Sequence, residues 1–426
     1  MSKKMKLIPK LRFSEFKNSK QWNEVDLNKL ANRVLLKNRD SLITTVFSNS
    51  AIDGIVDQRE YFDKDIANKN NLENYYVVEP NDYVYNPRIS SLAPVGPLFK
   101  NKTNKSGAMS PLYTVFRFNE KDNEFYEYYF KSRHWHDSIR KVANTGARFD
   151  RISITDSTFM EISVLFPEPK EQQKIASCLS SIDELIAAHS DKLETLKDHK
   201  KGLMQNLFPQ KGQRVPNYRF PEFEKDGEWV LNELSNCADV VDPHPSHRAP
   251  TAVNNCIPFI GIGDISEDGV LDTKNVRQVP KEILLEHNER YQLKVGDFAY
   301  GRVASVGKVV DLSKNIDKKY TYSPTMAIIQ PKEVDASFLR HFCNSNYFIN
   351  QVVAKTSGST RKSIGMQNLR ILKVCMPSSD NEQQKIASCL SSLDEIITAQ
   401  SEKIEQLQQH KKGLMQGLFP NTSEVR

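Results

Sequence analysis

Two segments of the chain carry the same long stripe of apolar residues. Apolar side chains recur at alternating steps of four and three across 175–207, and the pattern repeats across 386–418. This spacing is the a/d pattern of a coiled-coil helix, sustained for about five heptads. Polar residues interrupt both stripes at the same two places, namely His189 and Lys200 in the first and Gln400 and Lys411 in the second. The pattern therefore predicts two helices of roughly 37 residues, each about 55 Å long.

Prolines mark the expected limits of these helices. Pro169 precedes the first stripe, and Pro209 and Pro420 follow the two stripes. A proline is poorly tolerated inside a helix, so these positions are natural ends. An apolar stripe along one face of a helix must pack against another apolar surface, and the stripe of the other helix is the nearest one available. We predict that the chain folds back so that the two helices pair antiparallel. The alternative is that each stripe packs only against its own globular domain.

The helices belong to an internal duplication. The string EQQKIASCLSS occurs at 171–181 and at 382–392, and about 29 of the 39 positions in 171–209 match those in 382–420. A repeat of roughly 210 residues is too long for a solenoid. The match extends to the segments that open each repeat, where LRFSEF and Trp22 correspond to YRFPEF and Trp229. Further residues reappear in the same order, with Tyr76, Asp82, Tyr85, Arg88, Val95, Gly96, Ser110 and Pro111 matching Tyr291, Asp297, Tyr300, Arg302, Val306, Gly307, Ser323 and Pro324.

Short strand-like stretches dominate the two regions before the helices. Runs rich in β-branched and aromatic residues lie at 74–86, 111–118, 159–166, 256–265, 297–303 and 325–330. Helical stretches are expected around 120–141, 281–290 and 335–354. We therefore predict the α+β class, in which two similar mixed α/β domains with mainly antiparallel or irregular sheets are separated by two long helices that pair as an antiparallel coiled coil. The expected limits are 1–167 and 210–378 for the domains, 168–209 and 379–421 for the helices, and 422–426 for a tail.

The composition is that of an ordinary globular protein. The chain has 426 residues, of which 38% are hydrophobic and 26% charged, and a net charge of +6. No apolar run approaches about 18 residues, and the opening MSKKMKLIPK lacks the apolar core of a signal peptide. We therefore expect a cytoplasmic protein with no membrane partner. The six cysteines form no CxxC pair and are expected to be free thiols.

Basic and small polar residues gather in short clusters. The first domain carries KNKTNKSG at 100–107, RHWHDSIRK at 133–141 and GARFDR at 146–151, and the second carries clusters at 242–250, 300–308 and 357–363. Such groups suit the positioning of phosphates and hydrogen bonding to base edges. A single cluster of this kind is typical of a solvated surface, but their presence at similar places in both domains favours binding. The mild net charge permits a nucleic-acid partner without arguing for one by itself.

The sequence contains no complete match to the catalytic and cofactor-binding motifs considered. GIGDI at 261–265 lacks the third glycine of a dinucleotide fingerprint, and no GxxxxGK[ST] loop is present. NPRI at 86–89 has arginine where an adenine-methylase box has its second proline. HWHD at 134–137 has metal-ligand residue types but no second cluster. We therefore predict a chain that is not itself an enzyme and that has no catalytic, cofactor-binding or metal-binding residues.

The repeated plan resembles a known family. An RFxEF…W opening, then a domain that ends in P…EQQKIAxxLSxxD…HKKGLMQxLF, then the whole plan again, resemble the specificity subunit (S subunit, HsdS) of type I restriction-modification systems. The resemblance spans essentially the whole chain. It implies that each domain is a target recognition domain for one half of a bipartite, asymmetric double-stranded DNA target. It also implies that the helices form the spacer between the two domains.

The same resemblance implies partners. Two modification (methyltransferase) subunits would dock on the spacer, and restriction subunits, which form an ATP-dependent endonuclease, would join them. S-adenosylmethionine, ATP and Mg are expected in those partner subunits, with no cofactor in this chain. Two other hypotheses stay open, namely a coiled-coil scaffold with two protein-binding domains and no DNA role, and a stand-alone DNA enzyme with an unfamiliar site.

The basic clusters supply the candidate DNA-binding residues. In the first domain they are Arg88, Ser90, Ser91, Lys102, Lys105, Arg133, His134, Arg148 and Arg151. In the second domain they are His244, Ser246, His247, Arg248, Arg302, Ser305, Arg361 and Lys362. Arg88 and Arg302 are preferred because they match through the duplication. The alternative for these two arginines is a structural ion pair with Asp82 or Asp297.

Overall fold

The chain forms two compact units. The computed structural model describes residues 7–61, 69–143, 150–244, 246, 248–254, 256–266, 271, 275–358 and 361–420. The first unit consists of Met1–Ala188 and Glu405–Arg426, and the second of His189–Ile404. Each unit therefore combines one globular domain with the beginning of the long helix that follows it and the end of the other long helix.

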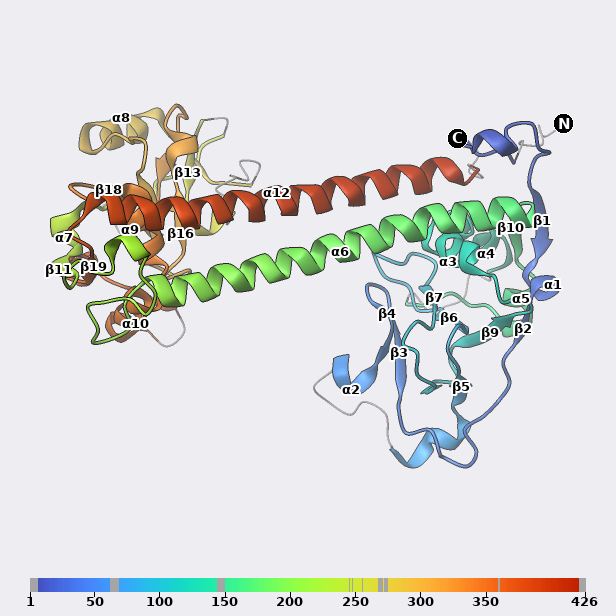
Figure 1. Ribbon diagram of the computed structural model, residues 1–426. Coiled ribbons are helices and arrows are strands. Elements are labelled where there is room, and N and C mark those ends of the chain that lie inside the picture. The colour runs from blue at the N-terminus through green and yellow to red at the C-terminus, as the bar shows by residue number, and fades with distance from the viewer. Residues whose placement is uncertain are drawn as a thin grey trace. The chain divides into compact units, whose positions relative to one another are not determined.

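A four-stranded antiparallel sheet lies at the centre of the first unit (Figure 1). Its order is β2 (Ala31–Arg33), β9 (Thr114–Phe118), β6 (Tyr83–Tyr85) and β7 (Leu98–Lys100). Three helices accompany it, α3 (Glu124–Lys131), α4 (His136–Val142) and α5 (Asp156–Met160). Aromatic rings fill the core, with Tyr83 stacked on Phe116 at 5.5 Å between ring centroids and Tyr85 stacked on Phe159 at 4.3 Å. These buried rings explain why this domain is rich in tyrosine and phenylalanine.

Two-stranded ladders complete the first unit. The antiparallel pairs are β1–β10, β3–β4 and β5–β8. Their bounds, with the remaining short elements, are η1 (Ser14–Phe16), β1 (Asn23–Asp26), α1 (Leu27–Leu30), β3 (Phe47–Ser50), β4 (Gly54–Asp57), α2 (Gln58–Tyr61), η2 (Lys69–Asn74), β5 (Tyr76–Val78), β8 (Gly107–Met109) and β10 (Ser163–Phe166). The strand predicted over 159–166 is therefore too long, because Phe159 and Met160 end α5. Thr155 caps that helix by accepting a hydrogen bond from the Thr158 backbone N–H.

The second unit repeats this design with additions. Its four-stranded sheet has the order β12–β18–β15–β16, a second sheet has the order β14–β13–β17, and β11 pairs with β19. The strands are β11 (Val230–Glu233), β12 (Ala238–Val241), β13 (Ile257–Ile260), β14 (Gln278–Val279), β15 (Phe298–Gly301), β16 (Val309–Asp311), β17 (Thr321–Tyr322), β18 (Met326–Pro331) and β19 (Lys373–Met376). The helices are η3 (Pro221–Phe223), α7 (Leu234–Cys237), η4 (Ile262–Asp264), α8 (Lys281–Arg290), η5 (Ser313–Asn315), α9 (Ala336–Cys343), α10 (Asn346–Lys355) and α11 (Met366–Arg370).

The two units share one α+β framework. The strand pairing makes β6 and β15 equivalent. β6 lies between β7 and β9, and β15 lies between β16 and β18, with every pair antiparallel. β9 leads to α3, as β18 leads to α9. Within the described residues the ladders are antiparallel except for β13–β17. The predicted class, two similar α/β domains with mainly antiparallel sheets, is confirmed.

The two predicted helices are α6 (Pro169–Leu207) and α12 (Asp380–Leu418), which lie side by side and antiparallel (Figure 1). Pro169 occupies the first position of α6, where its missing N–H removes no helix bond. The beginnings of the stripes do pack against their own domains, since Ile175 and Leu179 are buried in the first core and Ile386 and Leu390 in the second. The antiparallel pairing prediction is confirmed, and the alternative holds only for these first turns.

Each long helix begins in one unit and ends in the core of the other. Phe419, just after α12, is buried in the first unit against Trp22 and Phe125. Phe208, just after α6, is buried in the second unit against Phe338 and Phe342. The repeated LFP triplet therefore anchors the end of α6 in the second unit and the end of α12 in the first, because a large aromatic side chain is buried at each end.

The polar residues that interrupt the stripes meet complementary groups on the other helix. The Lys411 ammonium pairs with Asp183 in the first unit, and Lys200 pairs with Asp394 in the second. Gln400 donates from Nε2 to the His189 backbone oxygen over 2.8 Å. Each polar residue on one helix therefore meets a complementary group on the other, which removes the cost of an unpaired polar side chain in the seam.

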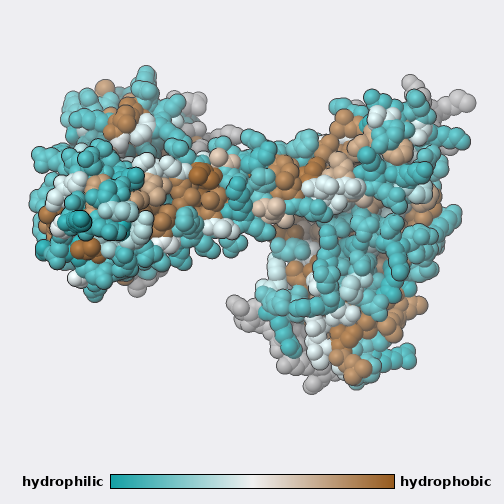
Figure 2. Space-filling view, in the orientation of Figure 1, coloured by the Kyte–Doolittle hydropathy of each residue, from teal (hydrophilic) through white to brown (hydrophobic). Residues whose placement is uncertain are grey.

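None of the described helices combines the length and apolar character needed to cross a bilayer. Figure 2 shows hydrophilic residues over most of the visible surface, with hydrophobic residues in separate patches. Such scattered apolar patches are usual on protein surfaces in contact with water.

Candidate nucleic-acid interface

Three loops meet beyond the end of β6 in the first unit. After Tyr85 the chain continues through 86–97, and the segment at 150–152 pairs with it. The Ile152 backbone N–H donates to the Pro87 oxygen over 2.8 Å, and the Ile89 N–H donates to the Asp150 oxygen over 3.0 Å. A turn at 110–113 borders the same region, because β9 begins next to the end of β6. We call these segments the first loop cluster.

The second unit builds the same arrangement from different residues. The loop 302–308 follows β15, and the segment 361–364 pairs with it through Ala304 N–H to the Lys362 oxygen, 3.0 Å, and Ile364 N–H to the Arg302 oxygen, 2.9 Å. The turn is tight, because a side chain at Gly301 would meet the Ser305 backbone oxygen at 2.1 Å. The loops 302–308, 323–325 and 361–364 form the second loop cluster.

The structure corrects the matching of Arg88 with Arg302. Tyr85 and Tyr300 occupy equivalent register positions in β6 and β15. The Ile152 N–H bonds to the Pro87 oxygen where the Ile364 N–H bonds to the Arg302 oxygen. Arg302 is therefore equivalent to Pro87, and Arg88 to Val303. The match by residue type and order fails because the hydrogen-bonded ladder, and not the order of similar residues, fixes the register of the two loops, which differ in length.

Arg88 presents an exposed cation. Its side chain is 69% exposed, and its guanidinium lies 3.9 Å from Asp150, whose carboxylate is the same distance from Arg151. Ser90 and Ser91 are exposed on the adjacent turn, where Ser90 Oγ accepts a hydrogen bond from the Ala93 N–H. Two arginines share one carboxylate here, so the cluster keeps a positive charge beside hydroxyl groups. Exposed charges held by weak ion pairs can exchange partners for phosphate or base edges.

Arg302 is held inside its unit. Its side chain is 12% exposed, and it donates from Nη1 to Asp242 over 3.2 Å and from Nε to the Ile364 oxygen over 3.3 Å. Burial is the largest influence on this guanidinium and lowers its pKa. The arginine therefore ties β12 to the loop cluster and is poorly placed to read a base.

The proposed ion pairs with Asp82 and Asp297 are wrong. Asp82 accepts from Arg117 Nε over 2.6 Å, and Asp297 accepts from Gln330 Nε2 over 2.6 Å. Both aspartates instead stabilise the turn before their strand. Asp82 accepts a hydrogen bond from the Glu79 backbone N–H, and Asp297 accepts one from the Lys294 backbone N–H. Their reappearance in both repeats is explained by this turn.

The remaining candidates of the second unit divide into exposed and buried residues. Arg361 and Lys362 are exposed and Ser305 is half-buried in the second loop cluster, and Ser246 and Arg248 are exposed on the loop after β12. His244 is buried, with Nδ1 at 3.1 Å from His287 Nε2. Burial lowers the pKa of His287 to about 4, so the His287 imidazole stays neutral at ordinary pH. His244 is therefore a packing residue, and His247 lies outside the described residues.

Several candidates of the first unit lie away from the first loop cluster. Lys102 and Lys105 follow β7, whose end adjoins the start of β6, so they sit at the opposite end of the sheet from Arg88. Lys102 pairs with Glu127 at 2.9 Å and Lys105 with Glu60 at 3.6 Å. Arg133 is exposed just after α3, whereas His134 stacks on Phe419 with ring centroids 5.6 Å apart. Arg148 lies outside the described residues.

Some residues of the loop clusters were not predicted. Asp150 and Asp242 position the arginines, although each lies within a predicted basic cluster, in GARFDR and DPHPSHRAP. Tyr113 is half-buried in the first loop cluster, and burial raises the pKa of its hydroxyl. The sequence indicates this residue only weakly, as a tyrosine shortly after Ser110 and Pro111. A sequence gives no measure of which carboxylate will neutralise which cation.

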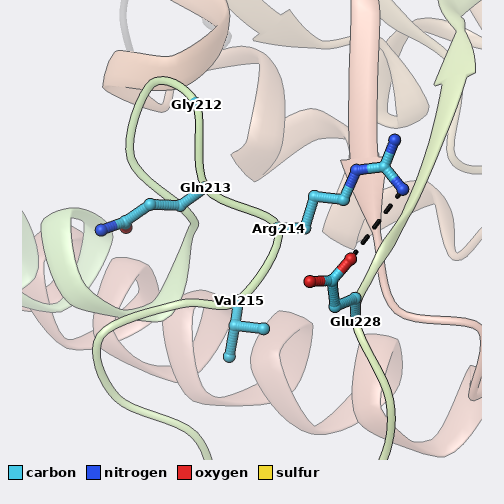
Figure 3. Close-up of a pocket in the computed structure, with 5 residues that line it drawn as sticks. All are labelled: Gly212, Gln213, Arg214, Val215 and Glu228. Carbon is cyan, nitrogen blue, oxygen red and sulfur yellow. Dashed lines mark ion pairs between the residues drawn. The ribbon is translucent and has the colours of Figure 1, made fainter.

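No group of three or more histidine, cysteine, aspartate or glutamate side chains that could hold a metal ion occurs in the part of the chain that the structure describes. The six cysteines are free thiols. A pocket of about 520 Å³ lies in the segment between α6 and β11, lined by Gly212, Gln213, Arg214, Val215 and Glu228 (Figure 3). Its two charged side chains pair with each other at 4.0 Å. It lacks the convergent polar groups in an apolar cavity that are typical of small-molecule sites.

Comparison with known proteins gives a consistent result. The model of the type I restriction modification DNA specificity domain matches residues 44–198 and 238–409. A type I restriction enzyme MjaVIII specificity subunit of Methanocaldococcus jannaschii is 24% identical over 307 residues, which cover 70% of each chain. A putative MjaX specificity subunit of the same organism is 23% identical over 286 residues, 64% of this chain and 62% of the relative.

Solved structures show the same fold. The S subunit of a type I restriction-modification system from M. genitalium matches with a TM-score of 0.55 and 13% identity, over 98% of this chain and all (100%) of that one. A chain from a study of complex assembly and conformational transition in a type I R-M system matches with a TM-score of 0.52 and 14% identity, over 94% and 98%. At these identities the likeness concerns the fold.

Proposed function

The chain belongs to the family of type I restriction modification DNA specificity domains, and we propose that each of its two units reads one half of a bipartite, asymmetric DNA target. As a DNA specificity subunit, it is a non-catalytic component of a type I restriction-modification complex. The scaffold without a DNA role and the stand-alone enzyme are thereby set aside.

One observation carries the assignment of half-sites. The two units share strands, register and turn-fastening aspartates, yet their loop clusters expose different groups. The first presents Arg88, Ser90 and Ser91, whereas the second presents Arg361 and Lys362. Arginine, lysine and serine donate to base edges and phosphates, and a different set of donors reads a different sequence. Two unlike loop clusters in one chain therefore support an asymmetric target.

The proposed contacts are the exposed or half-buried members of the predicted set in the two loop clusters and on the loop after β12. The exposed ones are Arg88, Ser90, Ser91, Ser246, Arg248, Arg361 and Lys362, and the half-buried ones are Arg151 and Ser305. Lys102, Lys105 and Arg133 are proposed to contact DNA only through phosphates, since they lie away from the first loop cluster. The paired helices α6 and α12 are proposed to set the number of unread base pairs between the half-sites.

The proposed assembly follows from the family. We propose that two methyltransferase subunits, which bind S-adenosylmethionine, and restriction subunits, which use ATP and Mg, join this chain. It would act where chromosomal and invading DNA are found, in the cytoplasm. The family match supports this assembly, and the antiparallel helices support two equivalent places for the methyltransferase subunits, because the same sequence occurs at both.

Domain exchange tests the proposal. Residues 10–165 would be replaced by the corresponding domain of a relative with a different target, and the methylated motif would be determined by methylome sequencing in a strain that lacks other systems. We expect one half of the motif to change while the other half and the gap stay the same. A change in both halves, or in neither, would show that the units do not each read one half-site.

A further inference from the structure

Two leucines of the first loop cluster face solvent, Leu92 with 66% and Leu112 with 63% of the residue exposed. Leu92 stands with Ser91 at the tip of a tight turn. The Ser90 N–H donates to the Ala93 oxygen over 3.0 Å, and the Ala93 N–H donates to Ser90 Oγ over 3.1 Å. Both hydrogen bonds are made by the residues that flank the tip. The shape of the turn therefore does not depend on the Leu92 side chain.

Leu112 stands at the tip of a second turn. The Tyr113 N–H donates to the Ser110 oxygen over 3.1 Å, which leaves Pro111 and Leu112 as the two central residues. A proline at the first of these positions already has the backbone angle that such a turn requires. This turn therefore does not depend on its leucine either.

Both leucines lie beside the cations of the same cluster. Thr114 pairs with Tyr85, so the turn that ends at 113 and the loop that begins at 86 leave the sheet at the same edge. Burial is the largest influence on the pKa of the Tyr113 hydroxyl and raises it, and the positive charges of Arg88 and Arg151 oppose this rise. Both arginines therefore lie near the turn. The leucines share one surface with side chains that can donate to phosphates and base edges.

The second loop cluster has no counterpart of these leucines. The strand register places Thr325 where the first unit has Leu112. Thr325 is half-buried, and its Oγ1 accepts a hydrogen bond from the Ile262 backbone N–H over 3.1 Å. The loop 301–308 is shorter than its equivalent 86–97, which carries Leu92. Throughout the second loop cluster, all of whose residues the structure describes, no large apolar side chain is exposed.

A single exposed leucine needs no explanation, because apolar side chains are common on protein surfaces. Here two of them stand at turn tips within one cluster that is proposed to contact DNA, and the related cluster has none. The major groove presents one apolar group, the C5-methyl of thymine, and apolar side chains recognise thymine by contact with it.

We propose that Leu92 and Leu112 are specificity-determining residues that contact thymine C5-methyl groups in the first half-site. This inference rests on the proposed function, in which each unit reads one half of the target. It adds an apolar contact to the polar ones and restricts that contact to one half-site. The second loop cluster, which exposes Arg361 and Lys362, has to read its half-site without such a contact.

Deoxyuridine tests the contact, because it pairs as thymidine does but lacks the C5-methyl group. The full chain, in complex with its methyltransferase subunit, would be titrated with duplexes that carry the methylated motif. The domain exchange described above shows which half-site belongs to the first unit. Replacing the thymidines of that half-site by deoxyuridine should weaken binding by about fourfold for each methyl contacted. The same replacement in the other half-site should leave the affinity unchanged.

Variants assign the effect to the two leucines. The double variant Leu92→Ala with Leu112→Ala should bind the thymidine and deoxyuridine duplexes equally. Leu92→Met with Leu112→Met should keep the preference for thymidine, because methionine is apolar and similar in volume to leucine. The matched control is Leu285→Ala on α8, which removes a leucine that is also 63% exposed but lies outside both loop clusters. This control should keep the preference as well.

Three outcomes would speak against the proposal. Equal binding of the two duplexes by the unchanged complex would overturn it, and is the result expected if the leucines were inserted between base steps. A double alanine variant that still prefers thymidine would also overturn it. A complex that did not distinguish the motif from unrelated DNA would contradict the proposed function, and this inference with it.

Discussion

Replacing Glu382 by glutamine should destabilise the second unit strongly. Glu382 Oε1 accepts from Arg219 Nε at 2.8 Å and from Trp229 Nε1 at 3.3 Å, and Oε2 accepts from Arg219 Nη2 at 2.7 Å. Glutamine keeps the shape but turns one of these oxygens into an NH₂ group that faces an N–H donor. The Arg219 charge then stays buried without its counter-ion. The helix start also loses a carboxylate that its dipole favours.

The magnitude follows from the burial of the pair, whose side chains are 8% and 1% exposed. Removing one partner of a buried ion pair costs about 3–5 kcal/mol. Arg219 keeps two backbone acceptors, the oxygens of Asp226 at 2.6 Å and Gly227 at 3.0 Å, so we expect the lower end, about 3 kcal/mol, in the free energy of unfolding. Arg219→Met removes the buried charge as well. The double variant should therefore be less destabilised than the sum of the single variants, by at least about 1 kcal/mol.

The duplication provides a matched comparison in the same molecule. Glu171→Gln breaks the equivalent pair with Arg12, and among the described residues the Trp22 indole N–H has no acceptor, whereas the Trp229 N–H donates to Glu382. The loss at Glu171 should therefore be smaller. Hydrogen-exchange mass spectrometry at increasing urea would measure both, with peptides over β10 for the first unit and over β19 for the second. A loss below about 1 kcal/mol for Glu382→Gln, or strictly additive single variants, would refute the reasoning.

Two further outcomes are expected. Lys200→Asp should destabilise the helix pair, because it replaces the ion pair with Asp394 by two like charges; the loss should be only about 1 kcal/mol, since the pair is partly exposed. Adding Asp394→Lys should restore most of this loss in urea titrations. No recovery in the swapped pair would contradict the prediction. His341 is buried between Ser391, Asp394, Arg340 and Lys200, and burial lowers its pKa to about 3. The unfolded chain binds a proton there below about pH 6.5 and the folded chain does not, so stability falls on acidification by up to about 1.4 kcal/mol per pH unit. His341→Gln should therefore lose less stability than the unchanged chain between pH 7.5 and 5.5, and equal losses would contradict the buried neutral state.

The long helices were the most predictable part of the molecule. Their apolar period is sustained, so each residue supports the same conclusion, and the duplication confirms it a second time. Short strands such as β6 and β15 were found because β-branched and aromatic residues fill them. The run at 159–166 misled because Phe159 and Met160 have strand-like side chains but end the capped helix α5. Tertiary packing decided that case over propensity.

The candidate site was less predictable for a physical reason. A sequence shows which side chains are charged, but not which of them are neutralised inside the fold. Arg302 and His244 carry suitable chemistry and are buried against Asp242 and His287. Lys102 and Lys105 are exposed but follow β7, at the far end of the sheet from Arg88. The antiparallel register decides where Lys102 and Lys105 lie, and residue type alone specifies register only weakly.

The charged residues in and beside the stripes also decide how the helices pair. Lys200 and Lys411 are equivalent through the duplication, and so are Asp183 and Asp394. A parallel in-register pairing would place each residue opposite its own equivalent, which brings like charges together in the seam. The antiparallel pairing brings each lysine to the aspartate of the other helix, so that one charge pattern forms two ion pairs. A duplicated helix with a positive end and a negative beginning therefore selects its own antiparallel partner, and the same polar residues that weaken the apolar seam specify its orientation.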